Sequence, residues 1–148
     1  MNLFRFRFRN VLRFREAKEE QKKQELGIKL NRLKHAEDEL NGIVNTSKKH
    51  DIMMEKSAQG RTSVRTLIYN YFYARFLDKS KSNQEKTVDV AKEDVEAKRI
   101  ELIEATKKKK ILERLKEREL EDYNRAIVKE EQTLIDEIAT QRFDRDVE

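Results

Sequence analysis

Along the first third of the chain, apolar residues recur every seven positions, at Leu12, Leu26, Leu33 and Leu40. Glu19 is the one exception in this series. Seven-residue spacing is typical of a coiled coil, in which each helix buries one narrow apolar stripe, the seam, against its partner. We therefore expect a long helix here, with Leu30 and Val44 in the alternate stripe of its seam.

A second periodic segment occupies the second half of the chain. Its apolar positions step by three and four, and Lys98 interrupts them before they resume: Val88, Ala91, Val95, Leu102 and Ala105. Acid-to-base pairs four residues apart, such as Glu104 and Lys108, stabilise a helix by about 0.2–0.5 kcal/mol each. The sequence thus predicts an all-α protein, a long antiparallel two-helix coiled coil in the form of a helical hairpin.

The chain reversal is predicted at residues 57–63, which read Ser-Ala-Gln-Gly-Arg-Thr-Ser. Gly60 can end a helix in the left-handed conformation. Thr62 or Ser63 can then cap the next helix. Residues 78–83 are the alternative turn, because they are polar, but they contain no glycine.

A turn near Gly60 brings the two seams into one register, in which facing residues have numbers that sum to about 121. Leu33 then faces Val88, Leu30 faces Ala91 and Leu26 faces Val95. The alternative turn would place Leu33 opposite Ile127. We expect a single rod-like domain with a first helical arm at 1–56, the turn at 57–63, and a second arm at 64–143, whose residues 121–143 overhang the N-terminus.

The composition favours such a coiled coil over a compact domain. Charged residues make up 43% of the 148, proline is absent, and apolar residues reach only 36%. This is too little for an ordinary core but enough for one buried stripe. Disorder is disfavoured because the apolar residues are periodic. With no cysteine, no membrane-spanning run and no secretory signal, we expect a cytoplasmic protein.

No constellation of catalytic residues emerges from the sequence. The segment at Gly60 lacks the first glycine of a phosphate-binding loop, since position 55 is Glu. His35 and His50 lie fifteen residues apart, without metal-ligand spacing, and we expect both on the solvated surface. A rod has no cleft in which carboxylates would be desolvated. We therefore expect no enzymatic activity, no cofactor and no metal site.

In the opening segment FRFRFRNVLRFRE, five arginines account for all of the net charge of +5: Arg5, Arg7, Arg9, Arg13 and Arg15. Strict alternation of apolar and polar residues is typical of a strand. No second strand is available to pair with it, so we expect instead an extended start that lies against the second helix. The register places Phe4, Phe6 and Phe8 beside Glu117, Leu115 and Glu113. A disordered basic tail is the alternative.

Aromatic residues cluster just after the turn. Leu67, Ala74 and Leu77 follow the predicted seam, so that Tyr69, Phe72 and Phe76 point away from it. Large exposed aromatic side chains at the tip of a hairpin indicate a binding surface. The alternative is that the tip folds over and buries them.

Both ends of the chain carry motifs: the opening segment alternates Phe and Arg before Val11 and Leu12, residues 112–118 read LERLKER, and residues 131–137 read EQTLIDE. Together they resemble the flagellar export protein FliJ family, and the resemblance spans nearly the whole chain. That family begins with alternating aromatic residues before Val-Leu, as the opening segment does here. It ends with an L-E-R-L-K-x-R block, here Leu112–Arg118, and then E-Q-x-x-x-D-E, here from Glu131 to Glu137.

The resemblance implies a non-enzymatic component of type III protein export. The family forms a coiled coil similar to the central stalk of rotary ATP synthases. It binds in the pore of the hexameric export ATPase and promotes its assembly, contacts the membrane-embedded export gate, and takes part in the traffic of export chaperones. Such a protein would be peripheral, at the cytoplasmic face of the inner-membrane export apparatus.

Two groups of residues are candidates for these contacts. The charged ends of the chain are predicted to contact the ATPase ring, through Arg5, Arg7, Arg9, Arg13, Glu131, Gln132, Asp136, Glu137 and Arg142. The aromatic residues near the turn are predicted to contact the export gate, as a hypothesis, through Tyr69, Phe72, Tyr73 and Phe76.

Three alternatives remain at the level of sequence. The stalk of a virulence type III secretion ATPase is closely related, and a generic coiled-coil scaffold has the same periodicity. A nucleic-acid binder would use the arginines and phenylalanines of the N-terminus for phosphates and bases. From Glu16 onward the charges cancel, which leaves no basic track, so we expect no nucleic-acid partner.

Overall fold

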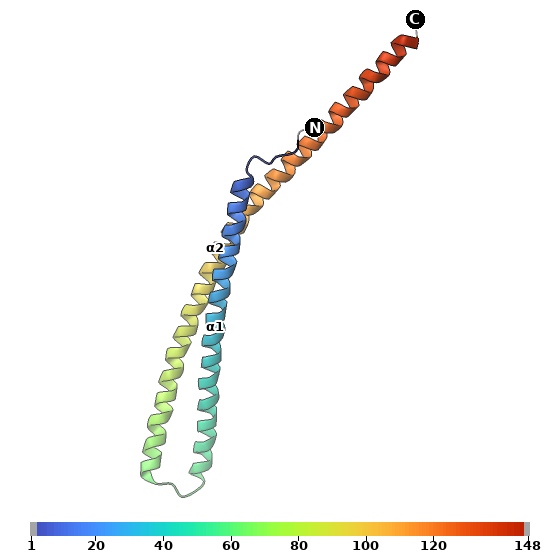
Figure 1. Ribbon diagram of the computed structural model, residues 1–148. Coiled ribbons are helices and arrows are strands. Elements are labelled where there is room, and N and C mark those ends of the chain that lie inside the picture. The colour runs from blue at the N-terminus through green and yellow to red at the C-terminus, as the bar shows by residue number, and fades with distance from the viewer. Residues whose placement is uncertain (1–2, 147–148) are drawn as a thin grey trace. The chain divides into compact units, whose positions relative to one another are not determined.

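The computed structural model describes residues 3–146, which form two long α-helices and no strand. Helix α1 spans Arg9–Ala58 and helix α2 spans Val64–Asp146 (Figure 1). The two helices pack against each other in antiparallel directions, as the cross-helix contacts described below show. This confirms the predicted all-α helical hairpin.

Residues 59–63 join the two helices. Gly60 does not adopt the left-handed conformation expected from the sequence, because no residue among those described has a positive φ. The end of α1 is satisfied instead by Thr62, whose Oγ1 donates a hydrogen bond of 2.9 Å to the carbonyl oxygen of Ser57. Ser63 caps α2 as predicted, since its Oγ accepts a hydrogen bond of 3.3 Å from the backbone N–H of Thr66.

Contacts divide the chain into two units, which are described separately. Unit 2 is Gln21–Ile103 and contains the turn with the adjoining parts of both helices. Unit 1 is Met1–Glu20 together with Glu104–Glu148 and contains both ends of the chain. Each unit therefore has its own set of contacts between α1 and α2.

The seam of unit 2 is formed by a few apolar residues from both helices. Ala36 of α1 and Leu77, Val88 and Val95 of α2 are buried. Three ion pairs across the helices fix the register: Lys22–Glu101, Lys98–Glu25 and Lys29–Asp94. The residue numbers of each pair sum to 123. The turn therefore lies near Gly60 rather than at residues 78–83.

The hydrogen bond from Nε2 of Gln84 to the carbonyl oxygen of Ala36 joins residues whose numbers sum to 120, so the cross-helix contacts of unit 2 bracket the predicted sum of about 121. The side chains that occupy the seam nevertheless differ from the prediction. Leu30 was expected to face Ala91 but is 39% exposed. Lys29 takes the position instead, and its Nζ lies 3.0 Å from Oδ2 of Asp94. The prediction failed because it required apolar partners at a level of the seam that charged residues occupy.

Unit 1 also has a polar residue in its seam. Leu12 and Phe6 are buried, and Glu19, which broke the seven-residue series, is buried too, with only 7% of its surface exposed. Its carboxylate lies 2.7 Å from Nζ of Lys109 and accepts a hydrogen bond of 3.1 Å from Oγ1 of Thr106, both on α2. Glu19 therefore continues the seam rather than interrupting it.

Candidate binding surfaces

The N-terminal segment lies against α2 within unit 1. Residues 3–6 have no regular structure, residues 7–8 form a turn, and α1 begins at Arg9. Phe6 is buried, and the ring of Phe4 lies 5.5 Å from that of Tyr123 (centroid to centroid). The extended start against the second helix is thus present, which argues against a wholly disordered tail.

The position of Phe4 is six residues further along α2 than the predicted neighbour, Glu117. The prediction assumed that the N-terminal segment advances at the rate of a helix, about 1.5 Å per residue. An extended chain advances about 3.3 Å per residue and so passes more of the neighbouring helix. The prediction for Phe4 was therefore wrong, because helix α1 begins only at Arg9.

The arginines predicted to contact an ATPase ring, Arg5, Arg7, Arg9 and Arg13, are all exposed. Three of them line a shallow depression together with Lys116 of α2. The first turn of α1 contains no acidic residue, so the positive end of its helix dipole adds to the arginine charge. The N-terminal segment of unit 1 therefore exposes a group of positive charges, which suits an acidic partner.

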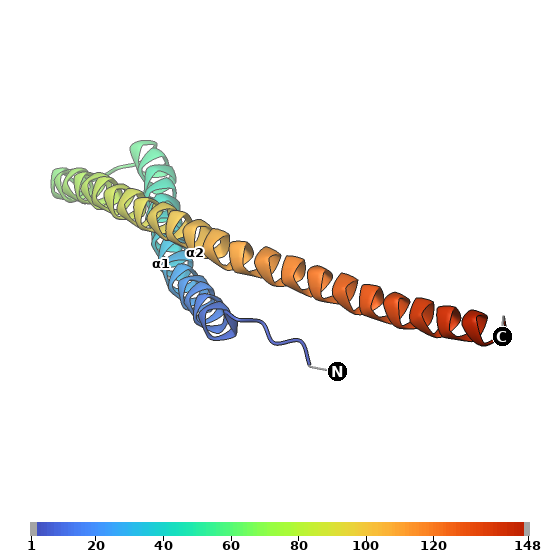
Figure 2. The ribbon, with the colours of Figure 1, turned by 90° about the horizontal axis from the view of Figure 1, so that it is seen from above.

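The C-terminal segment of α2, residues 128–143, exposes every side chain. No other segment of unit 1 lies beside its last turns in either view (Figures 1 and 2). It contains the remaining predicted ring contacts: Glu131, Gln132, Asp136, Glu137 and Arg142. Nε2 of Gln132 donates a hydrogen bond of 2.9 Å to Oδ1 of Asp136. These residues follow Tyr123 along α2, so both groups of predicted ring contacts belong to unit 1.

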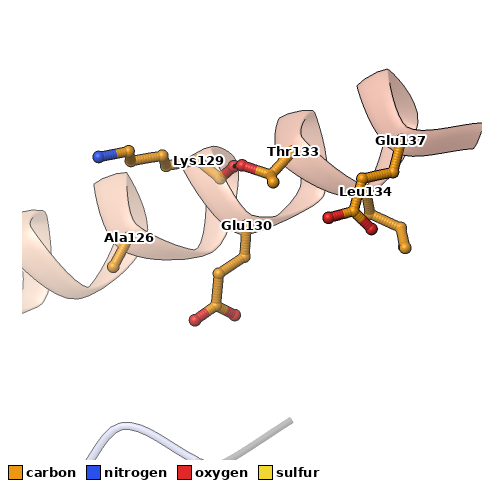
Figure 3. A pocket seen from close by; sticks show the side chains of 6 residues that line it. All are labelled: Ala126, Lys129, Glu130, Thr133, Leu134 and Glu137. Carbon is orange, nitrogen blue, oxygen red and sulfur yellow. Dashed lines mark hydrogen bonds between the residues drawn. The ribbon is translucent and has the colours of Figure 1, made fainter. Parts of the chain in front are cut away.

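A shallow depression on this part of α2 is built from one helix alone (Figure 3). Its side chains project from successive turns, with Leu134 close to Glu137 and Lys129 directed away from Glu130. Leu134 and Ile138 are exposed among the charges, although both are apolar. The segment therefore presents a mixed apolar and charged surface rather than an enclosed cavity.

The aromatic residues near the turn form one continuous surface on α2 of unit 2. Tyr69, Phe72 and Phe76 are 69%, 64% and 62% exposed, so the tip does not fold over them. Tyr73 is only partly exposed, and its ring stacks with those of Tyr69 and Phe76 at 6.3 and 6.4 Å. The four residues predicted to contact an export gate thus lie together.

Two seam assignments near the tip were wrong. Leu67 is 45% exposed, and Asn70 is buried in its place. His50 was expected on the surface but is 5% exposed, with its ring 4.9 Å from that of Tyr73 and no hydrogen-bond partner for Nε2. His50 lies two heptads after buried Ala36, and this spacing is the signal that would have placed it in the seam.

A family model described as flagellar FliJ protein matches residues 4–148 of the chain. The chain belongs to the FliJ family. Searches of curated proteins and of solved structures gave no match. Membership makes this chain a component of flagellar type III protein export, and the family is a non-catalytic one.

Sequence analysis missed a charged cluster in the seam of this FliJ-family chain. Lys22, Glu25, Lys98 and Glu101 come from both helices of unit 2, with N–O distances of 2.7–3.1 Å. Hydrogen bonds from Lys98 and then Lys22 lower the pKa of Glu25 to about 2. Hydrogen bonds to Lys22 and then Lys98 lower the pKa of Glu101, and the pKa of each lysine is raised in turn. All four groups are held in their charged forms.

Two further observations concern the described residues of this FliJ-family chain. Within residues 3–146, neither helix has a stretch long and apolar enough to cross a bilayer. The same residues contain no cluster of three or more histidine or carboxylate side chains that is placed to hold a metal ion.

Proposed function

We propose that this FliJ-family protein acts without enzymatic activity of its own, and that it binds in the pore of the hexameric export ATPase through unit 1 and promotes assembly and activity of the ring. The observation that carries the proposal is the C-terminal segment of α2, whose side chains are exposed at every position from 128 to 143. A helix that α1 does not cover is available to be surrounded by a ring.

The chemistry of unit 1 supports contacts that are numerous and individually weak. Arg5, Arg7, Arg9 and Arg13 are exposed charges, and such charges act over about 10 Å at 0.1 M salt. Exposed ion pairs stabilise a complex by only about 0–1 kcal/mol each. A stalk held in this way remains able to turn or rock inside a ring, whereas Leu134 and Ile138 supply a limited apolar contact.

Unit 2 would provide a second and more specific contact. Aromatic side chains are enriched at the energetically important positions of protein interfaces. We propose that Tyr69, Phe72, Tyr73 and Phe76 bind the cytoplasmic part of the export gate, and that export chaperones are further partners. The protein would then be peripheral at the cytoplasmic face of the export apparatus. The family match favours a flagellar rather than a virulence system.

The test of the ring contact is stimulation of the purified hexameric ATPase by the purified full-length protein. Arg5, Arg7, Arg9 and Arg13 are replaced by Gln in one variant, and Leu134 and Ile138 by Ser in another. Ile100→Ser, an equally exposed site in unit 2, is the matched control. We expect both unit 1 variants to stimulate the ATPase less than the parent does. For the arginine variant, the loss of stimulation relative to the parent should be largest at low salt.

Parent-level stimulation by the arginine variant at every salt concentration would show that these arginines do not contact the ring. If the Leu134 and Ile138 variant also stimulates like the parent, the proposal for unit 1 is wrong. A loss with Ile100→Ser would point to a general effect on folding.

A further inference from the structure

The tip of the hairpin, residues 45–81, exposes apolar side chains on more than its aromatic face. Ile52 and Met53 of α1 and Val64, Ile68 and Tyr71 of α2 are each more than half exposed. In a pair of helices each helix buries only one stripe against the other. Such exposed apolar surface indicates that the tip is an interaction site.

The tip is also the basic part of unit 2. It contains eight basic residues, Lys48, Lys49, Lys56, Arg61, Arg65, Arg75, Lys79 and Lys81, against three acidic ones, Asp51, Glu55 and Asp78. The rest of unit 2, residues 21–44 and 82–103, has nine basic and ten acidic residues. Positive charge and exposed apolar surface thus occur at the same end of unit 2.

Helical geometry separates the charges around the tip. His50 on α1 and Asn70 on α2 are buried in the seam, and equal offsets from such residues lie on the same side of an antiparallel pair. Offsets of minus one, plus three and plus six give Lys49, Met53 and Lys56 on α1, and Tyr69, Tyr73 and Phe76 on α2. Asp51 and Glu55 fall on the opposite side. One face of the tip therefore carries basic, aromatic and apolar side chains and none of its acidic ones.

We propose that the hairpin tip docks onto the surface of a bilayer that contains anionic phospholipids. Tyrosine and phenylalanine rings sit favourably at the level of the lipid headgroups, with their apolar parts inward and the tyrosine hydroxyls in water. Lysine and arginine side chains attract the lipid phosphates. The inference stands on the tip alone and adds a lipid contact to the proposed contact with the gate protein.

The distribution of side chains favours a bilayer over a protein groove. A groove on a protein receives one face of a helix, as in helix-in-groove recognition. Here Tyr69, Tyr71 and Ile68 leave α2 in three directions and are all exposed. A headgroup layer entered by the end of the hairpin surrounds all of these directions at once.

The N-terminal segment has a similar composition but a different structure. Phe6 is buried and Phe4 packs on Tyr123, so these rings are already covered within unit 1. Phe72 and Phe76 have no such cover. The arginines of the N-terminus are therefore the appropriate control for non-specific attraction to a charged surface.

The experiment is flotation of the full-length protein with vesicles of equimolar phosphatidylcholine and phosphatidylglycerol, compared with vesicles of phosphatidylcholine alone. One variant replaces Phe72 and Phe76 by Ser, and a second replaces Lys49, Lys56 and Arg65 by Gln. Controls replace Arg5, Arg7, Arg9 and Arg13, or Lys107, Lys108 and Lys110, by Gln. We expect the parent to bind to the anionic vesicles only. Both tip variants should bind these vesicles about tenfold more weakly, or weaker still.

A second readout does not depend on how well the tip variants fold. The chain has no tryptophan, so Phe72→Trp introduces a single fluorescent reporter at an exposed site. Its emission should shift to shorter wavelength with anionic vesicles and stay unchanged with phosphatidylcholine. Absence of binding to the anionic vesicles would overturn the proposal, as would loss of binding in the N-terminal variant with retention in both tip variants. Neither assay contains gate protein or ATPase, so these outcomes leave the proposed function to its own tests.

Discussion

The carboxylate of Glu25 on α1 accepts a hydrogen bond of 3.0 Å from the ammonium group of Lys98 on α2, across the seam of unit 2. Lys22 and Glu101 complete the cluster, so that each charge meets two opposite charges. An ionic layer in a coiled coil contributes little net stability, since its groups give up water. Its best-attested effect is to fix the register, because any shift would leave the charges unpaired.

This relationship predicts a specific loss of stability in acid. The pKa of Glu25 is about 2 in the folded chain, below its ordinary value of 4.5. A group whose pKa is lowered by folding stabilises the fold above its ordinary pKa and loses that effect as the pH falls through its folded pKa. Glu25→Gln should therefore lower Tm at pH 7, with a difference from the parent that shrinks between about pH 4.5 and 2.

Circular dichroism during thermal unfolding, repeated at several pH values, gives Tm as a function of pH for the parent and for Glu25→Gln. Glu96→Gln, at an exposed carboxylate on α2 of the same unit, is the matched control and should follow the parent. A constant difference between parent and Glu25→Gln from pH 7 to pH 2 would contradict the assigned role of the cluster.

The observed occupancy of the seam predicts which leucines hold the hairpin together. Leu77 is 6% exposed in the seam, whereas Leu30, which the sequence placed there, is 39% exposed. Leu77→Ala should lower the free energy of unfolding by about 2–3 kcal/mol, because it leaves a cavity. Leu30→Ala should change it by about 0.5 kcal/mol or less. Urea unfolding followed by circular dichroism measures both free energies, and equal losses would return Leu30 to the seam, as predicted from sequence.

How much of this fold the sequence predicts depends on the level of detail. The seven-residue spacing of the first half and the steps of three and four in the second half predict both helices. Ser63, one of the two predicted caps, marks the start of α2. The exact set of residues in the seam is beyond the same reasoning, because it assumes that apolar residues must face apolar residues. Here Glu19, Lys29 and Lys98 occupy the seam and form ion pairs with the other helix. The spacing of apolar residues gives no information on such pairs.

The candidate surfaces could likewise be predicted from the sequence only in part. Exposure of Tyr69, Phe72 and Phe76 follows from helical spacing alone. The contact of Phe4 with Tyr123 depends on where α1 begins. Phe8, which precedes Arg9, is not a residue that commonly caps a helix, so the sequence does not indicate where α1 begins. The burial of His50 was missed because a polar residue was assigned to the surface by its type rather than by its heptad position.

His50 provides a direct test of that last correction. A buried polar atom without a hydrogen-bond partner costs about 1–3 kcal/mol, and Nε2 of His50 is such an atom. His50→Leu removes it, although the ring contact with Tyr73 is lost as well. We expect a net gain of about 1 kcal/mol in the free energy of unfolding. His35→Leu, at an exposed site, is the control and should change little. A destabilised His50→Leu variant would mean that the imidazole finds a partner in solution.

The aromatic surface yields the prediction that bears most directly on the proposed gate contact. Phe72→Ala with Phe76→Ala removes two rings that are mostly in water, so helicity and Tm should stay close to those of the parent. Tyr73→Ala is the structural counterpart, because its ring is partly buried, lies 4.9 Å from that of His50 and should lower Tm. Binding to the soluble cytoplasmic part of the gate, measured by calorimetry without lipid, should weaken in the double variant, since exposed aromatic anchors commonly carry about 2 kcal/mol or more of an interface. If the double variant unfolds at a much lower temperature, the rings belong to the core. If it is stable and binds like the parent, the gate contact lies elsewhere.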